Sequence, residues 1–193
     1  MSTAPASAGW PGVRSWRVAM RRTLIASRLA LAQQQRERLS EQARQHLQQR
    51  ADLQRFDSLG IYWPVRGEID VRELARAQVA RGCAVALPVV VTPFAPVEFW
   101  RWEPQAPMTR GVWNIPIPAQ RRVMQPQALI VPLVGFDERR YRLGYGGGYY
   151  DRTLAQAAPR PFCIGLGYAL GRLDSIYPQT HDIAMDVIVT DAG

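Results

Sequence analysis

Hydrophobic and polar positions follow two different patterns along the chain, and the change falls near Leu59. Residues 16–54 contain no Gly or Pro, few β-branched residues, and many Arg, Gln, Glu, Leu and Ala, which predicts helix. No clear break is marked near Leu31–Gln35, so this stretch can form one long helix or two packed helices. After Leu59, short apolar runs alternate with turn residues, as is typical of strands.

The apolar runs predict the strands of a sheet. The run 59–63 stops at Pro64, residues 97–102 alternate like a half-exposed strand, and the nearly all-apolar runs predict strands buried on both faces: 83–91, 128–133, 162–166 and 187–190. Asp70 followed by Glu73 is a capping-box-like start for a helix to about Ala80, with Gly82 as its C-cap. This order predicts an α/β fold with a mostly parallel sheet flanked by helices, whose ligand site lies outside the carboxyl ends of the strands.

Three sequence features indicate the extent of the domain and the compartment of the protein. Residues 1–13 lack the basic and apolar regions of a signal peptide, so we expect a disordered leader before a single domain over 14–193. The longest apolar stretch, 84–100, is interrupted by three prolines and does not suit a membrane span. Cys83 and Cys163 are far apart with no CxxC motif, which favours a reduced, cytoplasmic setting over a disulfide framework.

The composition excludes several mechanisms. All 24 basic residues are arginine, so the chain has no P-loop lysine and no Schiff-base lysine. Residues 14–55 carry ten arginines against three acidic residues, and this segment supplies most of the net charge of +8. A solvated helix face is the simplest interpretation, and an anion-binding arm for nucleic acid or polyphosphate is the alternative. Aromatic residues are absent from 17–55, so we do not expect nucleic acid as a partner.

The segment 142–152 carries the strongest chemical signal. Four glycines in the five positions 144–148 let the backbone approach a ligand closely, and successive N–H groups there can bind an anion. A helix that starts near Tyr149 directs its positive end at the same place. Arg142 can add a bidentate phosphate contact, and Asp151, in the first helical turn, can hold Mg²⁺ against bound phosphates. The pattern predicts a phosphate cradle in which arginine replaces the P-loop lysine.

Residues 142–152, Arg-Leu-Gly-Tyr-Gly-Gly-Gly-Tyr-Tyr-Asp-Arg, resemble the signature of the 5-formyltetrahydrofolate cyclo-ligase family, also called 5,10-methenyltetrahydrofolate synthetase. The resemblance runs from about Arg17 to Asp191. Supporting stretches in the same order are Ile61-Tyr62-Trp63-Pro64, Glu68-Ile69-Asp70, Leu87-Pro88-Val89, Trp113-Asn114-Ile115-Pro116, His181-Asp182-Ile183 and residues 185–190.

The resemblance implies an ATP- and Mg²⁺-dependent ligase that converts 5-formyltetrahydrofolate to 5,10-methenyltetrahydrofolate and releases ADP and phosphate. In the family, the formyl oxygen is thought to attack the γ-phosphate, after which N10 closes on the activated carbon. Such a reaction needs alignment and charge neutralisation rather than a protein nucleophile. The sequence agrees, because it offers no convincing Ser/His/Asp or Cys/His set.

The resemblance also implies roles for individual residues. Arg17 and Arg21 match two basic ATP contacts, with Arg17 standing where Lys is usual. The implied ATP-binding residues are Arg17, Arg21, Arg142, Leu143, Gly144, Tyr145, Gly146, Gly147, Gly148, Tyr149 and Tyr150, with Arg142 and Tyr149 as catalytic residues. Trp63, Glu68 and Trp113 are implied as folate contacts. Asp151 and Asp186 are implied as Mg²⁺ ligands.

The chain departs from the family pattern at two positions. Ile117 stands where many members have a polar residue, and Ala32 where Ser or Thr often caps the second helix.

Two other functions are alternatives to the ligase. One alternative is a catalytically altered relative that acts as a nucleic-acid-binding or regulatory module. The other is an ATP-dependent enzyme for a different acyl or cofactor substrate. We expect small-molecule partners only, no membrane, and a monomer.

Overall fold

The structure, a computed structural model, describes residues 9–193. The helices are α1 (Gly9–Ala30), α2 (Gln33–Arg50), α3 (Arg72–Ala80) and α4 (Tyr149–Gln156), with short 3₁₀ helices η1 (Leu53–Arg55), η2 (Val112–Asn114) and η3 (Ala169–Gly171). The strands are β1 (Ser58–Gly60), β2 (Ala84–Val89), β3 (Glu98–Trp102), β4 (Met108–Arg110), β5 (Pro116–Pro118), β6 (Val123–Met124), β7 (Ala128–Pro132), β8 (Gly135–Phe136), β9 (Arg142–Leu143), β10 (Phe162–Leu166) and β11 (Val187–Val189).

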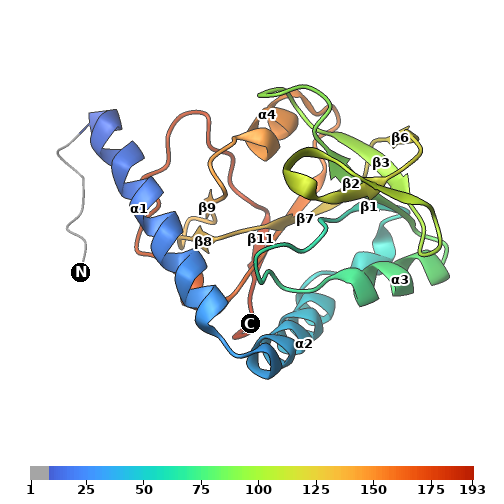
Figure 1. Ribbon diagram of the computed structural model, residues 1–193, viewed down its shortest axis with the longest axis horizontal. Helices are drawn as coiled ribbons and strands as arrows, with labels where there is room; N and C mark the ends of the chain where they lie inside the picture. Colours follow the sequence, from blue (N-terminus) through green and yellow to red (C-terminus); the bar gives the residue numbers. More distant parts are fainter. Residues whose placement is uncertain (1–8) are drawn as a thin grey trace.

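Seven strands form one mixed, mostly parallel sheet in the order β11-β10-β7-β1-β2-β3-β6 (Figure 1). The five strands from β11 to β2 pair in parallel, whereas β3 pairs antiparallel with β2 and with β6. The predicted α/β class and mostly parallel sheet are therefore confirmed. Two small antiparallel ribbons, β4-β5 and β8-β9, lie outside this sheet, and the sequence patterns did not predict them.

Alternating residues of the central strands build a core on each face of the sheet. Leu59 and Ile130 face α2 and α3, where they pack with Leu47 and Leu74. Leu129 and Val131 belong to the core on the other face, which includes Leu154 of α4. Figure 1 shows α2 and α3 below the sheet and α4 above it. Burial on both faces explains why these strands are continuous apolar runs.

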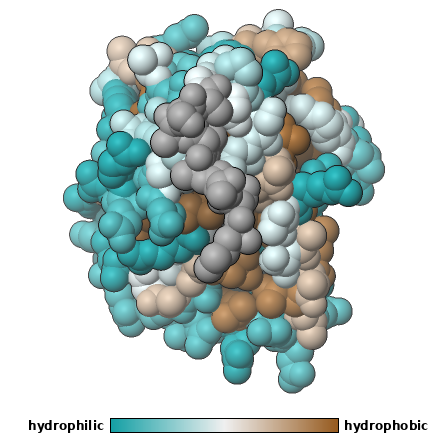
Figure 2. Space-filling model, turned by 90° about the vertical axis from the view of Figure 1, so that its left-hand side faces the viewer, coloured by the Kyte–Doolittle hydropathy of each residue, from teal (hydrophilic) through white to brown (hydrophobic). Residues whose placement is uncertain are grey.

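Helix α1 lies beside the β8-β9 ribbon at one end of the sheet (Figure 1). Its Leu24 joins a third buried cluster with Val134, Leu143 and Ile176. The surface on this side is mixed, with hydrophilic residues beside a smaller hydrophobic area (Figure 2). The helix also contacts the rest of the protein through three of its five arginines, Arg17, Arg21 and Arg28, which donate hydrogen bonds to distant backbone carbonyls.

The helical segment begins earlier than predicted, and it forms the second of the two arrangements that the sequence left open. Helix α1 begins at Gly9, inside the stretch 1–13 that we expected to be a disordered leader; residues 1–8 lie outside the described residues. Pro11 falls in the first turn of α1, where its missing N–H has no helical partner to lose. The chain forms two helices that break at Leu31 and Ala32, and Ala32 makes no side-chain cap. Within residues 9–193, no helix combines the length and apolar character of a membrane span.

Candidate active site

The glycine loop, defined here as residues 144–148, connects β9 to the first turn of α4. Gly146 has φ 96° and Gly148 has φ 66°, a left-handed conformation that favours glycine. The Nε of Arg21 donates to the Gly144 carbonyl at 2.6 Å, so α1 holds the start of the loop. Arg152 Nη1 donates to the Gly147 carbonyl at 2.5 Å. The predicted order of a strand ending at Leu133, the glycine turn and a helix is present as β7, the glycine loop and α4, with the unpredicted β8-β9 ribbon between β7 and the loop.

Arg17 is almost fully buried beneath the segment 176–182. Its Nε donates to the Ile176 carbonyl at 3.0 Å, and Nη2 donates to the Tyr177 carbonyl at 2.9 Å. Both Asp182 oxygens accept from the same guanidinium, with Nη2–Oδ2 at 2.5 Å. Burial would raise the pKa of Asp182, but the hydrogen bonds and positive charge of Arg17 outweigh it and the pKa is lowered. Arg17 therefore anchors this segment to α1.

Arg142 and Asp151 form a partly buried ion pair at the start of α4. Arg142 Nη2 lies 3.1 Å from Asp151 Oδ2, and Nη1 donates to the Ile183 carbonyl at 3.2 Å. The other Asp151 oxygen accepts from the Ile183 amide at 3.1 Å. The Arg142 guanidinium also lies 5.6 Å from the centre of the Tyr150 ring. The structure thus brings together three residues that the resemblance had implied: Arg142, Tyr150 and Asp151.

Asp186 lies in a different setting, directly before β11 at the amino ends of β10 and β11. Its Oδ2 accepts from the Cys163 amide at 2.7 Å, and its Oδ1 accepts from Arg160 at 3.0 Å. Within residues 9–193, no group of three or more His, Cys, Asp or Glu side chains is arranged to hold a metal ion. Mg²⁺ in nucleotide sites often takes only one or two carboxylates. Asp151 fits such a role better than Asp186, because it lies in the first turn of the helix that follows the glycine loop.

Glu68 is joined directly to the glycine loop. The Tyr145 hydroxyl donates to Glu68 Oε1 at 2.8 Å, and the Val65 amide donates to Oε2 at 2.8 Å. Glu68 is only 8% exposed. Burial raises the pKa of Glu68 above its usual range, although the hydrogen bonds from Val65 and Tyr145 and the charges of Arg28 and Arg66 oppose this rise. A residue implied for folate and a loop implied for ATP are therefore in contact.

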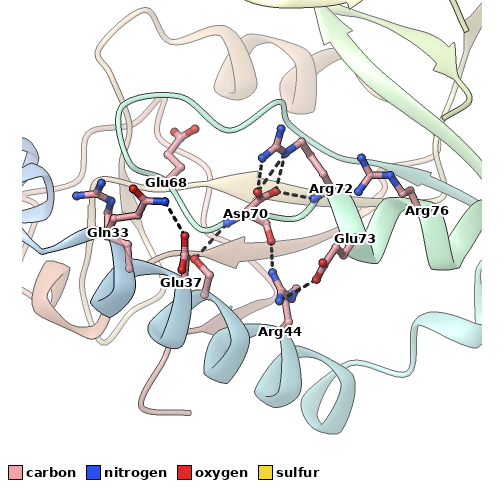
Figure 3. Close-up of a pocket in the computed structure, with 10 residues that line it drawn as sticks. Gln33, Glu37, Arg44, Glu68, Asp70, Arg72, Glu73 and Arg76 are labelled. Carbon is pink, nitrogen blue, oxygen red and sulfur yellow. Dashed lines mark hydrogen bonds and ion pairs between the residues drawn. The ribbon is translucent and has the colours of Figure 1, made fainter. Parts of the chain in front are cut away.

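A polar cavity of about 510 Å³ lies between α2 and the start of α3 and reaches Glu68 (Figure 3). Gln33 and Glu37 of α2 line one side, and Arg72 and Arg76 of α3 line another (Figure 3). The remaining lining residues are Arg36, Ser40, Arg44, Asp70 and Glu73. The Arg72 guanidinium lies 5.7 Å from the centre of the Trp63 ring, which places Trp63 beside this cavity with Glu68.

Trp113 lies next to Tyr149, whereas Trp63 lies next to Arg72. The two rings meet edge to face, with their centres 5.6 Å apart. Trp113 has φ 56° and is 66% exposed. The Tyr149 hydroxyl accepts from the Phe94 amide at 3.4 Å, and Phe94 is 73% exposed. An accessible aromatic surface therefore adjoins the glycine loop at the first residue of α4.

Three residues of this site were not singled out from the sequence as functional candidates: Arg28, Phe94 and Asp182. Arg28 could have been identified from the sequence by its spacing. Arg17, Arg21 and Arg28 follow the spacing i, i+4, i+11, which places them on one face of a helix. Asp182 and Phe94 carry no comparable signal, since their contacts join segments that are far apart in the chain.

Known proteins match the chain along nearly its whole length. The model of the 5-formyltetrahydrofolate cyclo-ligase family matches residues 13–191. The chain is 29% identical over 177 residues to the 5-formyltetrahydrofolate cyclo-ligase of Haemophilus influenzae, covering 87% of this chain and 92% of that one. It is 32% identical over 173 residues to the 5-formyltetrahydrofolate cyclo-ligase of Escherichia coli K12, covering 84% and 93%.

A solved structure agrees with the sequence matches. The 5,10-methenyltetrahydrofolate synthetase of Aquifex aeolicus superposes with a TM-score of 0.79 at 26% identity, covering 92% of this chain and 90% of that one. The fold, the glycine loop and these matches lead to one conclusion. This chain belongs to the 5-formyltetrahydrofolate cyclo-ligase family.

Proposed function

We propose that this chain, as a 5-formyltetrahydrofolate cyclo-ligase, uses ATP to close the formyl group of 5-formyltetrahydrofolate onto N10, giving 5,10-methenyltetrahydrofolate, ADP and phosphate. One observation carries the assignment of the reaction to this site. The Tyr145 hydroxyl of the glycine loop is hydrogen-bonded to Glu68, so a phosphate cradle and a carboxylate suited to a pterin edge are adjacent. A ligase that transfers phosphate to its second substrate needs this adjacency.

The glycine loop binds the triphosphate in this proposal. Backbone amides of the loop and the start of α4 face the phosphates, and the left-handed Gly146 and Gly148 allow the close approach. Arg21, whose Nε already holds the Gly144 carbonyl, adds positive charge beside the loop. Arg142 supplies a second guanidinium at the start of α4. These groups counter the charge that develops on the transferred phosphoryl oxygens.

Asp151 is the carboxylate that we assign to Mg²⁺, which, when bound with ATP, would neutralise phosphate charge. Its position in the first turn of α4 puts it next to the proposed phosphate site, and its side chain is 18% exposed. Arg142 and the Ile183 amide fix its orientation. Asp186, whose oxygens bind Arg160 and the Cys163 amide, has the weaker claim to be a metal ligand.

The folate lies between the aromatic surface at Tyr149 and the cavity at Glu68. Glu68 accepts hydrogen bonds from the donor-rich edge of the pterin, with Trp63 beside the same cavity. Trp113, in contact with Tyr149, covers a flat face of the substrate near the glycine loop. This arrangement directs the formyl group toward the terminal phosphate.

The reaction then balances without a protein nucleophile. The formyl oxygen forms a bond to the γ-phosphorus as the bond between that phosphorus and ADP breaks. The N10 lone pair attacks the activated formyl carbon, the carbon–oxygen bond breaks, phosphate leaves, and N10 loses its proton to solvent. Arg142 and Tyr149 act by holding the phosphoryl group and the substrate in line. The interpretation as a monomer stays a prediction.

The direct test mixes purified protein, MgATP and 5-formyltetrahydrofolate and follows the near-ultraviolet absorbance of the methenyl product. We expect the band to grow only when ATP is present, with one ADP released for each product molecule. ATP hydrolysis without a methenyl band would instead favour an enzyme for another acyl substrate. Absence of both products with folded protein would overturn the proposal.

A further inference from the structure

Arg28 is buried in α1 and donates its hydrogen bonds to the two segments that form the site. Arg28 is only 3% exposed. Burying a charged group costs free energy unless hydrogen-bond partners compensate for the lost water. The Nε donates to the Arg66 carbonyl at 3.0 Å, and Nη2 donates to the Tyr145 hydroxyl at 2.7 Å. Arg66 belongs to the turn that leads to Glu68, and Tyr145 belongs to the glycine loop.

We propose that Arg28 is a positioning residue of the active site: it fixes the Tyr145 hydroxyl so that Tyr145 donates to Glu68, and it thereby couples the glycine loop to the folate-binding turn. This inference rests on the proposed function. Arg28 touches neither substrate in this account and acts through Tyr145 and the Arg66 carbonyl.

The geometry of the Tyr145 hydroxyl makes the coupling directional. A phenolic hydroxyl has one hydrogen to donate and can accept from other donors. Because Arg28 can only donate, the hydroxyl accepts from Arg28 and directs its own hydrogen to Glu68 Oε1, 2.8 Å away. Two guanidinium groups lie near the Tyr145 ring, that of Arg28 at 6.0 Å and that of Arg66 at 5.7 Å from its centre. The ring and hydroxyl orientation are therefore both set by arginine.

The turn before Glu68 also depends on Arg28. Arg66 has φ 48° and Gly67 has φ 72°, and a non-glycine residue in the left-handed region is strained. The bond from Arg28 Nε to the Arg66 carbonyl holds this strained conformation. The Val65 amide, one residue earlier, binds the second Glu68 oxygen. A planar guanidinium can reach the Arg66 carbonyl and the Tyr145 hydroxyl together, whereas a lysine ammonium offers a single point charge.

If Arg28 positions Tyr145, its loss should change the pKa of Glu68 and therefore the pH dependence of folate binding. The titratable and charged groups around Glu68 are Arg28, Tyr145, Tyr150, Tyr62 and Arg66. The cavity that Glu68 reaches is also lined by charged side chains of α2, α3 and the residues before α3: Arg36, Glu37, Arg44, Asp70, Arg72, Glu73 and Arg76. Burial raises the pKa of Glu68, while Tyr145 and Arg28 lower it. Removing either of these two opposing groups therefore raises the pKa further. The acid limb of folate binding then moves to higher pH.

The test compares Arg28→Met with Arg22→Met, a change of the same charge at an exposed position of the same helix. We expect Arg28→Met to raise the KM for 5-formyltetrahydrofolate about tenfold at neutral pH, since the lost hydrogen bond involves a charged group. The acid limb of kcat/KM for folate should move to higher pH, and the KM for ATP should change much less. Arg22→Met should match the wild type, and Arg28→Lys should recover only part of the loss.

A double-mutant cycle separates positioning from a general loss of stability. Tyr145→Phe removes only the hydroxyl and should reproduce the rise in folate KM and the shift in pH. Because both changes break one chain of hydrogen bonds, the double variant should be little worse than either single variant. Additive effects, or an Arg28→Met enzyme with an unshifted pH profile, would overturn the positioning role. A wild-type enzyme that makes no methenyl product would instead defeat the proposed function itself.

Discussion

Gly148 provides a quantitative test of the glycine loop because it has φ 66° and ψ 16° at the N-cap of α4. An L-residue in the left-handed region costs about 1–2 kcal/mol. A Cβ at Gly148 would lie 3.0 Å from Arg152 Nη1, the far end of a flexible side chain that can move. Backbone strain therefore dominates the effect of Gly148→Ala. For a chain of this size, the loss corresponds to a decrease in Tm of about 2–8 °C.

Gly82 supplies a control with the same kind of strain away from the site. It has φ 92° after the end of α3, and no atom lies within 4 Å of a Cβ placed there. Gly82→Ala should lose a similar amount of stability and keep the wild-type kinetics. Gly148→Ala can relieve its strain by rotating the peptide groups that lead into α4, which displaces the amides proposed to bind phosphate. We expect kcat/KM for ATP to fall about tenfold, the equivalent of about 1.4 kcal/mol.

Two measurements decide this prediction. Urea unfolding gives the loss of stability for each variant, and initial rates of methenyl formation at varied ATP give the kinetic effect. The reasoning is refuted if Gly148→Ala loses stability as Gly82→Ala does but keeps its kcat/KM for ATP. It is also refuted if both variants lose the same activity, because strain far from the loop would then explain the effect.

The ion pair, the buried hydroxyl and the metal ligand each give a further prediction. Asp182→Asn leaves the Arg17 charge without its partner, so we expect a loss of about 3–5 kcal/mol in urea unfolding at neutral pH. The pKa of Asp182 lies below its usual 3.8, so this contribution is present above about pH 4 and fades as the pH falls through the folded pKa; a gap between variant and wild type that stays constant down to pH 3 would contradict this. Tyr150→Phe removes a buried hydroxyl that has no hydrogen-bond partner within residues 9–193, so the free energy of unfolding should stay unchanged or rise by about 1 kcal/mol; a fall in kcat/KM for either substrate would show that the hydroxyl binds ligand. Asp151→Asn should raise the Mg²⁺ concentration needed for half-maximal rate at least tenfold, whereas Asp186→Asn should mainly lower stability; equal Mg²⁺ dependence of the two variants would remove the assignment to Asp151.

The central strands of the sheet could be predicted because they are buried on both faces, whereas the exposed two-residue edge strand β6 was not predicted. The run 162–166 matches β10, and the runs 83–91 and 128–133 differ from β2 and β7 by at most two residues at either end. The ribbons β4-β5 and β8-β9 could not be predicted, since strands of two or three residues leave no periodic pattern. Pro116 and Pro118 within β5 also argue against a strand in sequence alone.

The break between α1 and α2 depends on contacts that local sequence does not encode. No glycine or proline marks it, and Ala32 gives no side-chain cap. Instead, the Arg36 guanidinium reaches back to the carbonyls of Leu29 and Leu31 at the end of α1. A basic side chain that binds the last carbonyls of a helix stabilises that end. Periodicity predicts that a helix exists, but it does not show that Arg36 folds back onto it.

The glycine loop could also be predicted as an element, but its contacts could not. Its residues signal a phosphate cradle, and the structure agrees with the order of strand, loop and helix. The partners of the loop were not predictable, because Arg21 and Glu68 reach it from segments 123 and 77 residues away along the chain. Hydrogen bonds over such separations follow from the fold and not from local pattern.

The arginine content of the chain takes on a different meaning in the folded protein. The basic segment 14–55 resembled a solvated face, yet Arg17 and Arg28 are among its most buried residues. Arg17 uses its planar guanidinium to bind two carbonyls and both oxygens of Asp182, and Arg28 binds a carbonyl and a hydroxyl. A lysine at either place could not span those acceptors at once. The planar guanidinium of Arg17 therefore anchors residues 176–182 to α1, and the same geometry at Arg28 joins the glycine loop to the turn that leads to Glu68.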